Sequence, residues 1–217
     1  MPLAIFDLDE TLIDGDCASL WSREMARLGW VDEESFLRKD AELMAEYAFG
    51  KLAMEDYMAF SLAPLVGRSR EEVDYVVAPF VEEVIEPLIF SDAMRCVAAH
   101  RAAGDRILIV SASAEFLVGA IAERLGVDEV LAIDVEEQHD FLTGRTQGVL
   151  TYRDGKVQRL EAWLAEQGES LDGAHFYSDS RNDLPLLTRV DFPHVVNPDP
   201  VLREHAERAG WPILDWS

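Results

Sequence analysis

The chain has 217 residues, 49% hydrophobic and 28% charged, which describes a soluble globular protein with room for one core and a small appended domain. Its formal net charge of −23 would repel phosphate backbones and anionic lipid, so we expect neither nucleic acid nor a membrane as a partner. No apolar run reaches the roughly 18 residues of a membrane span, and the N-terminal residues do not resemble a signal peptide, so we expect a cytoplasmic protein.

Short apolar strands alternate with helical segments along the chain, a pattern typical of a parallel sheet with crossover helices. The expected strands are residues 2–6, 106–111, 130–134 and 174–178, with weaker ones at 194–196 and 212–214. Helices are expected at 91–103, 114–125, 156–167 and 199–209, and a small hairpin with a glycine turn at 141–150. We therefore expect an α/β fold with a doubly wound, Rossmann-like parallel sheet.

One long segment interrupts this alternation directly after the first strand. It has helical periodicity and no convincing strand, and it predicts helices at 17–28, 33–48, 54–62 and 69–84. We interpret residues 16–85 as an all-helical cap inserted into a core made of residues 1–15 and 86–217. Such a cap would cover the carboxyl end of the first strand, where open α/β sheets bind their ligands.

The first strand leads directly into a series of carboxylates. Asp7 follows the apolar residues 4–6 without a break, and Asp9, Asp14 and Asp16 come soon after. An ordinary polar turn with an aspartate capping the next helix is one explanation. The position of Asp7 favours another, in which its carboxylate lies at the buried end of the strand.

Further polar side chains are expected at the ends of the other strands, on the same edge of the sheet. Ser111 or Ser113, and also Asp183, have a simpler explanation as helix caps. Lys156 does not, because a cation in the first turn of a helix opposes the helix dipole and needs an anionic partner. The residues that this edge gathers are Asp7, Asp9, Ser111, Lys156, Asp179 and Asp183.

Clustered carboxylates need a compensating charge. Two of them within ~4 Å repel by about 4 kcal/mol at an effective dielectric near 20. Oxygen ligands without histidine or cysteine favour a hard cation, and Mg²⁺ is the usual choice where phosphate completes the coordination shell.

These motifs resemble those of a known superfamily. The sequence DLDET at 7–11, the strand-end Ser111, Lys156 and SDSRND at 178–183 match, in order and spacing, the four motifs of the haloacid dehalogenase superfamily. The second aspartate, Asp9, is typical of its phosphatases. The helical insertion resembles the C1 cap of subfamily IB, which includes phosphoserine phosphatase-like and histidinol-phosphatase-like enzymes. Ser178 stands where many relatives have glycine, and as a small residue it leaves Asp179 in place.

The resemblance implies a Mg²⁺-dependent phosphomonoesterase acting on a small phosphorylated metabolite. Asp7 would be the nucleophile that forms an aspartyl phosphate, and Asp9 the general acid and base. Thr11 would position Asp9 or its loop near the phosphate. Phosphate binding would fall to Ser111 and Lys156, and metal binding to Asp7, the Asp9 carbonyl and Asp179, with Asp183 orienting the shell.

The cap suggests a substrate class. Asp16 occupies the position at which the phosphoserine phosphatases resembled here place an acid that meets the substrate amine, although a helix cap before Cys17 is an equal alternative. Their arginine for the substrate carboxylate corresponds to Ala59, and no arginine lies between Arg38 and Arg68. We therefore expect an amino-alcohol phosphate such as L-histidinol phosphate, with phosphoserine as the alternative.

Two other functions stay open at this stage. A phosphotransferase of the same superfamily would share the four motifs. A receiver-like phospho-switch would also have an acidic cluster and a lysine, but its phosphorylated aspartate ends the third strand and no cap follows. The sequence makes no prediction about the oligomeric state.

Overall fold

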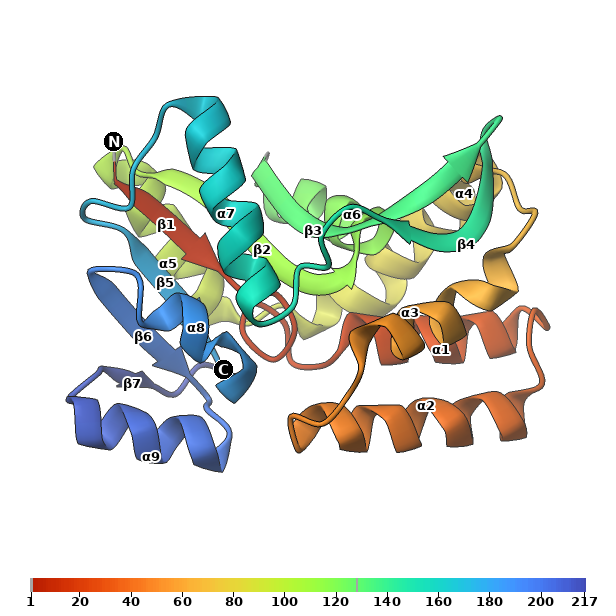
Figure 1. Cartoon of the computed structure of the whole chain (residues 1–217), viewed down its shortest axis with the longest axis horizontal. Coiled ribbons are helices and arrows are strands. Elements are labelled where there is room, and N and C mark those ends of the chain that lie inside the picture. Colours follow the sequence, from red (N-terminus) through yellow and green to blue (C-terminus); the bar gives the residue numbers. More distant parts are fainter. Residues whose placement is uncertain (1, 128) are drawn as a thin grey trace.

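A computed structural model of the chain describes residues 2–127 and 129–217. Within them the strands form one sheet, and all neighbours pair in parallel except β3 and β4 (Figure 1). The expected doubly wound α/β sheet is confirmed. Its order is β4 (Phe141–Gln147), β3 (Glu129–Gln138), β2 (Arg106–Ala114), β1 (Leu3–Phe6), β5 (His175–Ser178), β6 (Phe192–Val196) and β7 (Ile213–Leu214).

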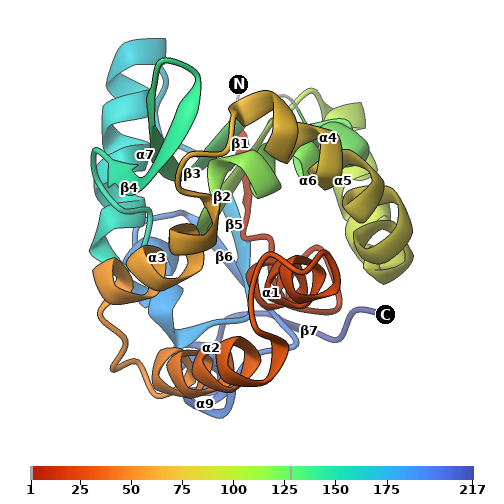
Figure 2. The same ribbon diagram turned by 90° about the vertical axis from the view of Figure 1, so that its right-hand side faces the viewer.

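Helices cover both faces of the sheet (Figure 2). Along β1, Ala4 and Phe6 join one apolar cluster, while Leu3 and Ile5 join a second, as expected for a strand buried on both sides. The first cluster contains side chains of α5 (Ser91–Ala103) and α6 (Glu115–Leu125). The second contains side chains of α7 (Asp154–Gln167), α8 (Leu184–Leu187) and α9 (Pro200–Ala209).

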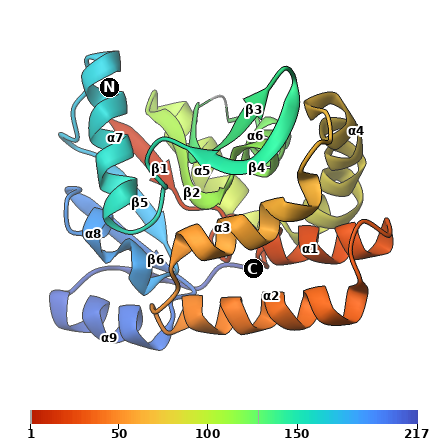
Figure 3. The same ribbon diagram turned by 45° about the vertical axis from the view of Figure 1, so that its right-hand side comes forward.

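The segment after β1 is helical, as predicted. It contains α1 (Cys17–Arg27), α2 (Glu33–Ala48), α3 (Met54–Leu62), η1 (Ala63–Leu65), α4 (Arg70–Phe80), η2 (Val81–Ile85) and η3 (Glu86–Leu88). Figure 3 shows α1, α2 and α3 together near the carboxyl end of β1, with α4 beside α6. Apolar side chains of these helices belong to the same cluster as one face of the sheet, so the division into core and cap stays a prediction.

The predicted hairpin at 141–150 is wrong in its position. Residues 141–147 form a single strand, β4, which pairs antiparallel with β3. The turn lies at His139 and Asp140, which both adopt positive φ angles, 53° and 68°, as in a two-residue hairpin turn. The turn could not be recognised in the sequence, because neither of its two residues is the glycine that usually marks such a turn. Gly144 lies within β4, where a Cβ would come within 2.5 Å of Val66.

Among the residues that the structure describes, no helix combines the length and the apolar character needed to cross a bilayer.

Three histidines gather on the face of the sheet covered by α5. His175 and His194 share a hydrogen bond of 2.9 Å between ring nitrogens, and the His194 ring stacks on Tyr177. Burial, together with the nearby His175 and His100, lowers the pKa of His194 to about 4. His100 in turn contacts Asp105, at 2.7 Å. The folded chain therefore favours a neutral ring at His194.

We expect this cluster to destabilise the fold in mild acid. An unfolded histidine titrates near 6.5, so between about pH 6.5 and about pH 4 the unfolded chain binds a proton that folded His194 does not. The free energy of unfolding should therefore fall as the pH is lowered through this interval. The decrease should be less than about 1.4 kcal/mol per pH unit, because the ring is partly exposed to screening water. Urea unfolding at about pH 7.5 and about pH 5 would measure it.

The informative comparison is with His194→Gln, which should lose less stability between the two pH values than the wild-type chain. His205→Gln is a matched control, because His205 packs on Trp211 outside this cluster. Equal losses in all three proteins would contradict the prediction.

Candidate active site

Asp7 lies at the buried end of β1, as its place in the sequence predicts. Its main-chain N donates to Tyr177 O at 2.9 Å, so the pairing of β1 with β5 fixes the backbone up to this residue. The chain then turns at Glu10, whose φ is 55° and whose N donates to Gly15 O at 3.1 Å. The turn leaves Asp7 and Asp9 lining the same cavity.

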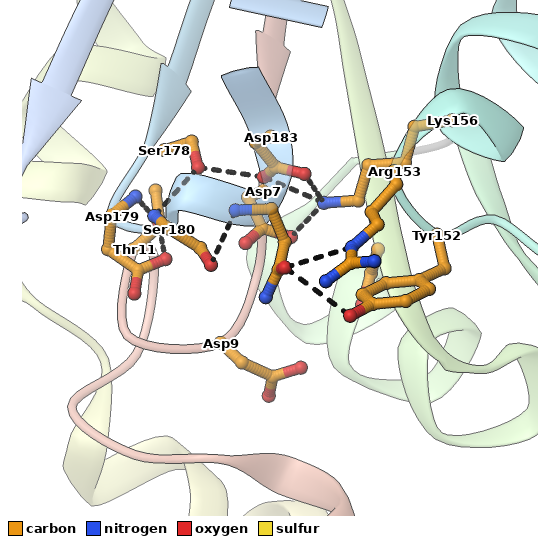
Figure 4. Close-up of polar contacts among 12 residues, drawn as sticks. Asp7, Asp9, Thr11, Tyr152, Arg153, Lys156, Ser178, Asp179, Ser180 and Asp183 are labelled. Carbon is orange, nitrogen blue, oxygen red and sulfur yellow. Dashed lines mark hydrogen bonds and ion pairs between the residues drawn. The ribbon is translucent and has the colours of Figure 1, made fainter. Parts of the chain in front are cut away.

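A buried ion-pair network holds Asp7. Lys156 Nζ lies 2.9 Å from Asp7 Oδ1 and 2.8 Å from each carboxylate oxygen of Asp183 (Figure 4). Ser178 Oγ donates to Asp183 Oδ2 at 2.7 Å. Burial raises the pKa of Asp7 to about 6 against the opposing effect of Lys156. Burial lowers the pKa of Lys156, but Asp183 and Asp7 outweigh it and the net shift is upward.

Gly155 explains how Lys156 reaches this position. A Cβ at residue 155 would lie 1.9 Å from the carbonyl oxygen of Leu150, which is closer than any side chain can approach. The glycine therefore lets the first turn of α7 pack against the preceding loop. This packing brings Lys156 close to Asp7 and Asp183. It confirms the prediction that a lysine in the first turn of a helix has an anionic partner.

Asp179 follows β5 and contacts Thr11. Thr11 Oγ1 donates to Asp179 Oδ1 at 3.2 Å and accepts from Asp179 N at 3.1 Å. Burial raises the pKa of Asp179 well above its usual range, and the charges of Asp7 and Asp183 raise it further. The hydroxyl of Thr11 thus joins the β1 loop to the β5 loop, and its expected effect on Asp9 and phosphate stays a prediction.

Asp9 has a separate set of partners, and Figure 4 shows it apart from the lysine network. Its Oδ1 accepts from Cys17 N at 2.7 Å, and its Oδ2 accepts from Ser113 Oγ at 2.8 Å. Burial raises the pKa of Asp9 to about 6, while the Cys17 N–H group opposes the shift. The expectation that Ser113 caps a helix is not met, because α6 has no side-chain cap.

Ser111 is fully buried in β2, and its Oγ accepts from Ser113 N at 3.1 Å. The residues of β2 that line the cavity are Ala112 and Ser113. The proposed contact of Ser111 with phosphate therefore stays a prediction. The helix-cap explanation of Asp183 fails, because its side chain binds Lys156 and Ser178 and makes no cap bond to α8.

The carboxylates open into a cavity of about 500 Å³ between the sheet and the helical segment. Asp7, Asp9, Asp16 and Asp179 supply acidic groups, and Arg181, which the sequence analysis gave no role, supplies a guanidinium. Most of the apolar part of the wall comes from the helical segment, through Ala18, Met44, Tyr47, Ala48, Phe49, Leu52, Met54 and Tyr57.

The helix-cap explanation of Asp16 is confirmed, and its expected contact with a substrate amine stays a prediction. Its Oδ1 accepts from Ser19 N at 2.7 Å and caps α1, and the residue also lines the cavity. Burial raises the pKa of Asp16 to about 7, and the neighbouring charge of Asp9 adds to the shift.

Residues outside the helical segment also bind the end of α2. Asn182 Nδ2 donates to Tyr47 O at 3.4 Å, and Arg153 donates to Gly50 O. Arg153 Nε also donates to Asn182 Oδ1, at 3.2 Å. These contacts to main-chain carbonyls hold the cavity wall against the core without depending on the side chains of the helical segment.

The donor chemistry of the site fits a hard cation. Asp7 and Asp179 offer carboxylate oxygens, and their raised pKa values reflect burial and mutual repulsion that a cation would relieve. Among the described residues no three His, Cys, Asp or Glu side chains form a group that could hold a metal ion. A cation here would therefore need main-chain and substrate oxygens besides these carboxylates.

Comparisons with known proteins agree with this geometry. Residues 4–188 match the family model for haloacid dehalogenase-like hydrolases. The chain is 37% identical to a histidinol-phosphatase of Neisseria meningitidis, over 99% of this chain and 98% of that protein. A solved structure from Bordetella pertussis, described as a protein with unknown function, is 38% identical, with a TM-score of 0.92 and coverage of 99% and 98%.

A more distant structure shares the fold. A substrate-bound phosphoserine phosphatase superposes with a TM-score of 0.72 at 21% identity, over 98% of this chain and 92% of that one. The family model alone spans most of the sequence and includes β1, Lys156 and the loop after β5. The chain therefore belongs to the haloacid dehalogenase-like hydrolase family.

Proposed function

We propose that this chain is a Mg²⁺-dependent phosphomonoesterase that hydrolyses a small amino-alcohol phosphate, L-histidinol phosphate, through an aspartyl phosphate. The observation that carries the proposal is the arrangement of Asp7, with Lys156 on one of its oxygens and Asp9 beside it on the same cavity. This set of groups suits attack on a phosphate ester.

Asp7 acts as the nucleophile. Lys156 occupies Oδ1 and fixes the carboxylate, which leaves Oδ2 as the oxygen that attacks phosphorus. The carboxylate becomes an acyl phosphate as the substrate's ester oxygen leaves. Hydrolysis of this acyl phosphate then regenerates Asp7, so one difficult reaction is divided into two easier displacements.

Asp9 transfers the protons of both steps. It protonates the ester oxygen as the alcohol leaves, and as a carboxylate it then takes a proton from the attacking water. Its contacts with Cys17 N and Ser113 Oγ fix its orientation toward the cavity. Lys156 and Ser111 are proposed to bind phosphoryl oxygens, with Thr11 ordering the loop.

Asp7, Asp179 and the main-chain carbonyl of Asp9 would hold the Mg²⁺ ion, and Asp183 would orient them through its neighbours. When bound, the ion neutralises the phosphate and the carboxylates around it. Asp183 itself is engaged with Lys156 and Ser178, so its role is to fix the lysine and the loop after β5.

The residues of the cavity wall support the choice of L-histidinol phosphate as the substrate. The apolar side chains from α2 and α3 suit a flat ring such as imidazole, and Asp16 suits an ammonium group. The full-length similarity to the Neisseria meningitidis histidinol-phosphatase points to the same compound.

Arg181 favours a second candidate, L-phosphoserine. The sequence analysis found no arginine in the cap to bind a carboxylate, yet Arg181 reaches the cavity from the core. A guanidinium binds a carboxylate through two hydrogen bonds. Phosphoserine carries this group and histidinol phosphate does not, so the two substrates depend differently on Arg181.

We expect hydrolysis of p-nitrophenyl phosphate that requires Mg²⁺, because Asp7 and Asp179 need a compensating cation. Excess EDTA should abolish the release of inorganic phosphate, and Asp7→Asn should do the same with Mg²⁺ present. Release of phosphate in the absence of any acceptor alcohol would distinguish hydrolysis from phosphotransfer. Turnover that persists in EDTA or in Asp7→Asn would refute the mechanism.

Asp9→Asn should slow turnover by ~10² to 10⁴, the usual contribution of a general acid and base. The amide keeps the shape of the side chain, so a fluoride-type phosphate mimic should still bind with near wild-type affinity. Steady-state kinetics and a binding titration would measure the two properties. An unchanged rate would remove Asp9 from the mechanism.

For the substrate, we expect a higher kcat/KM with L-histidinol phosphate than with L-phosphoserine. Asp16→Asn should erode this preference, because the amide loses the charge that attracts the amine. The same amide can still accept the hydrogen bond from Ser19 N, so α1 stays capped. Competition assays with the two phosphates would measure the preference.

Asp32→Asn is the matched control, because Asp32 caps α2 through Ser35 N in the same way and is exposed outside the cavity. It should leave the preference unchanged. If phosphoserine is turned over about tenfold better, and Arg181→Gln abolishes that advantage, the second candidate is the substrate and Arg181 binds its carboxylate.

A further inference from the structure

Ser113 contacts the general acid and base of the proposed mechanism. Its hydroxyl is buried and donates to Asp9 Oδ2 at 2.8 Å, while Oδ1 of the same carboxylate accepts from Cys17 N at 2.7 Å. Each oxygen of Asp9 thus has one fixed donor, one from the core and one from the first residue of α1. The inference below rests on the proposed role of Asp9.

The end of β2 has an irregular conformation where it presents Ser113. β2 and β3 pair in register up to Val110 and Leu131, but the next paired residues are Ala114 and Ile133. Two extra residues of β2 therefore lie between these pairs. Such a bulge redirects side chains, and bulges are common beside active sites. Ser113 N donates to Ser111 Oγ within the bulge, which fixes its backbone.

Ser113 has no evident structural task that would explain the contact instead. The residue before α6 is Ala114, and the helix has no side-chain cap, so the hydroxyl of Ser113 is not used to cap it. The hydroxyl of Ser113 points to Asp9, and both residues line the cavity.

The chemistry of the two donors differs. The N–H group of Cys17 can donate only, so it favours ionised Asp9. A serine hydroxyl can donate or accept, so Ser113 can keep its hydrogen bond whether Asp9 is a carboxylate or a carboxylic acid. A group that first gives and then takes a proton needs a neighbour that accommodates both forms.

We propose that Ser113 is a positioning residue that holds Asp9 in the orientation for proton transfer to the leaving alcohol. A hydrogen bond to a charged group is stronger than one between neutral groups, so its loss should be measurable. The loss should matter most for substrates whose leaving group needs a proton.

The test compares two leaving groups in Ser113→Ala. p-Nitrophenolate is a stable anion that leaves without being protonated, whereas an alkoxide needs a proton as it leaves. We expect kcat/KM for the best alkyl phosphate of a metabolite panel to fall on the order of tenfold, with p-nitrophenyl phosphate affected less than about twofold. Because both rates come from one preparation, a misfolded fraction cancels in their ratio. Ser113→Thr retains the hydroxyl and should restore the wild-type ratio.

Ser22→Ala is the matched control. Ser22 is buried and donates to a carboxylate, Asp40, at 3.0 Å, yet it does not contact Asp9. It should leave the ratio unchanged. An equal loss for both substrates in Ser113→Ala would overturn the inference, since that result indicates phosphate binding or general destabilisation.

Asp9→Asn separates this inference from the proposed function. If Asp9→Asn shows the dependence on leaving group and Ser113→Ala does not, only the role of Ser113 is wrong. If neither shows it, Asp9 is not the general acid and both proposals fail.

Discussion

The ion pairs of Lys156 are the interaction on which the site depends. The lysine is 1% exposed and binds Asp7 and Asp183, which come from opposite ends of the sequence. Removing one partner of a buried ion pair typically costs about 3–5 kcal/mol, because the charge left behind has no water to solvate it. The start of α7, the end of β1 and the loop after β5 are therefore fixed relative to one another by charge. In a chain of net charge −23, this lysine also supplies local positive charge where a phosphate would bind.

Asp9 is held differently, by both parts of the chain. One of its donors belongs to α1 and the other to β2. The orientation of Asp9 is thus correct only when the helical segment lies against the sheet, as the contacts of Asn182 and Arg153 with the end of α2 arrange. Coupling of this kind would let closure of the cavity and alignment of Asp9, the proposed general acid, occur together and so exclude water from the proposed proton transfer.

Much of this arrangement could be predicted from the sequence, for physical reasons. The four helices of residues 17–85 follow from apolar periodicity, and Asp7 from its position directly after a buried strand. Lys156 was identified by its conflict with the helix dipole. The turn at His139 and Asp140 was missed because it lacks glycine, and Ser113 because a bulge that redirects a strand leaves no pattern in the residues themselves. Arg181 lay inside a recognised motif, but which way a loop side chain points depends on tertiary contacts.

Asp16 shows how one carboxylate can cap a helix and still line the cavity. One oxygen caps α1, and the residue also lines the cavity beside Asp9. A helix cap is rigid, so a carboxylate used in this way presents its remaining oxygen in a fixed direction at little further entropic cost. The proposed chemistry and the proposed selectivity therefore depend on different parts of the fold. Asp7 and Asp9, which are proposed to react, follow β1, whereas the apolar cavity wall comes mainly from residues 44–57, whose side chains take no part in the ion pairs of Lys156.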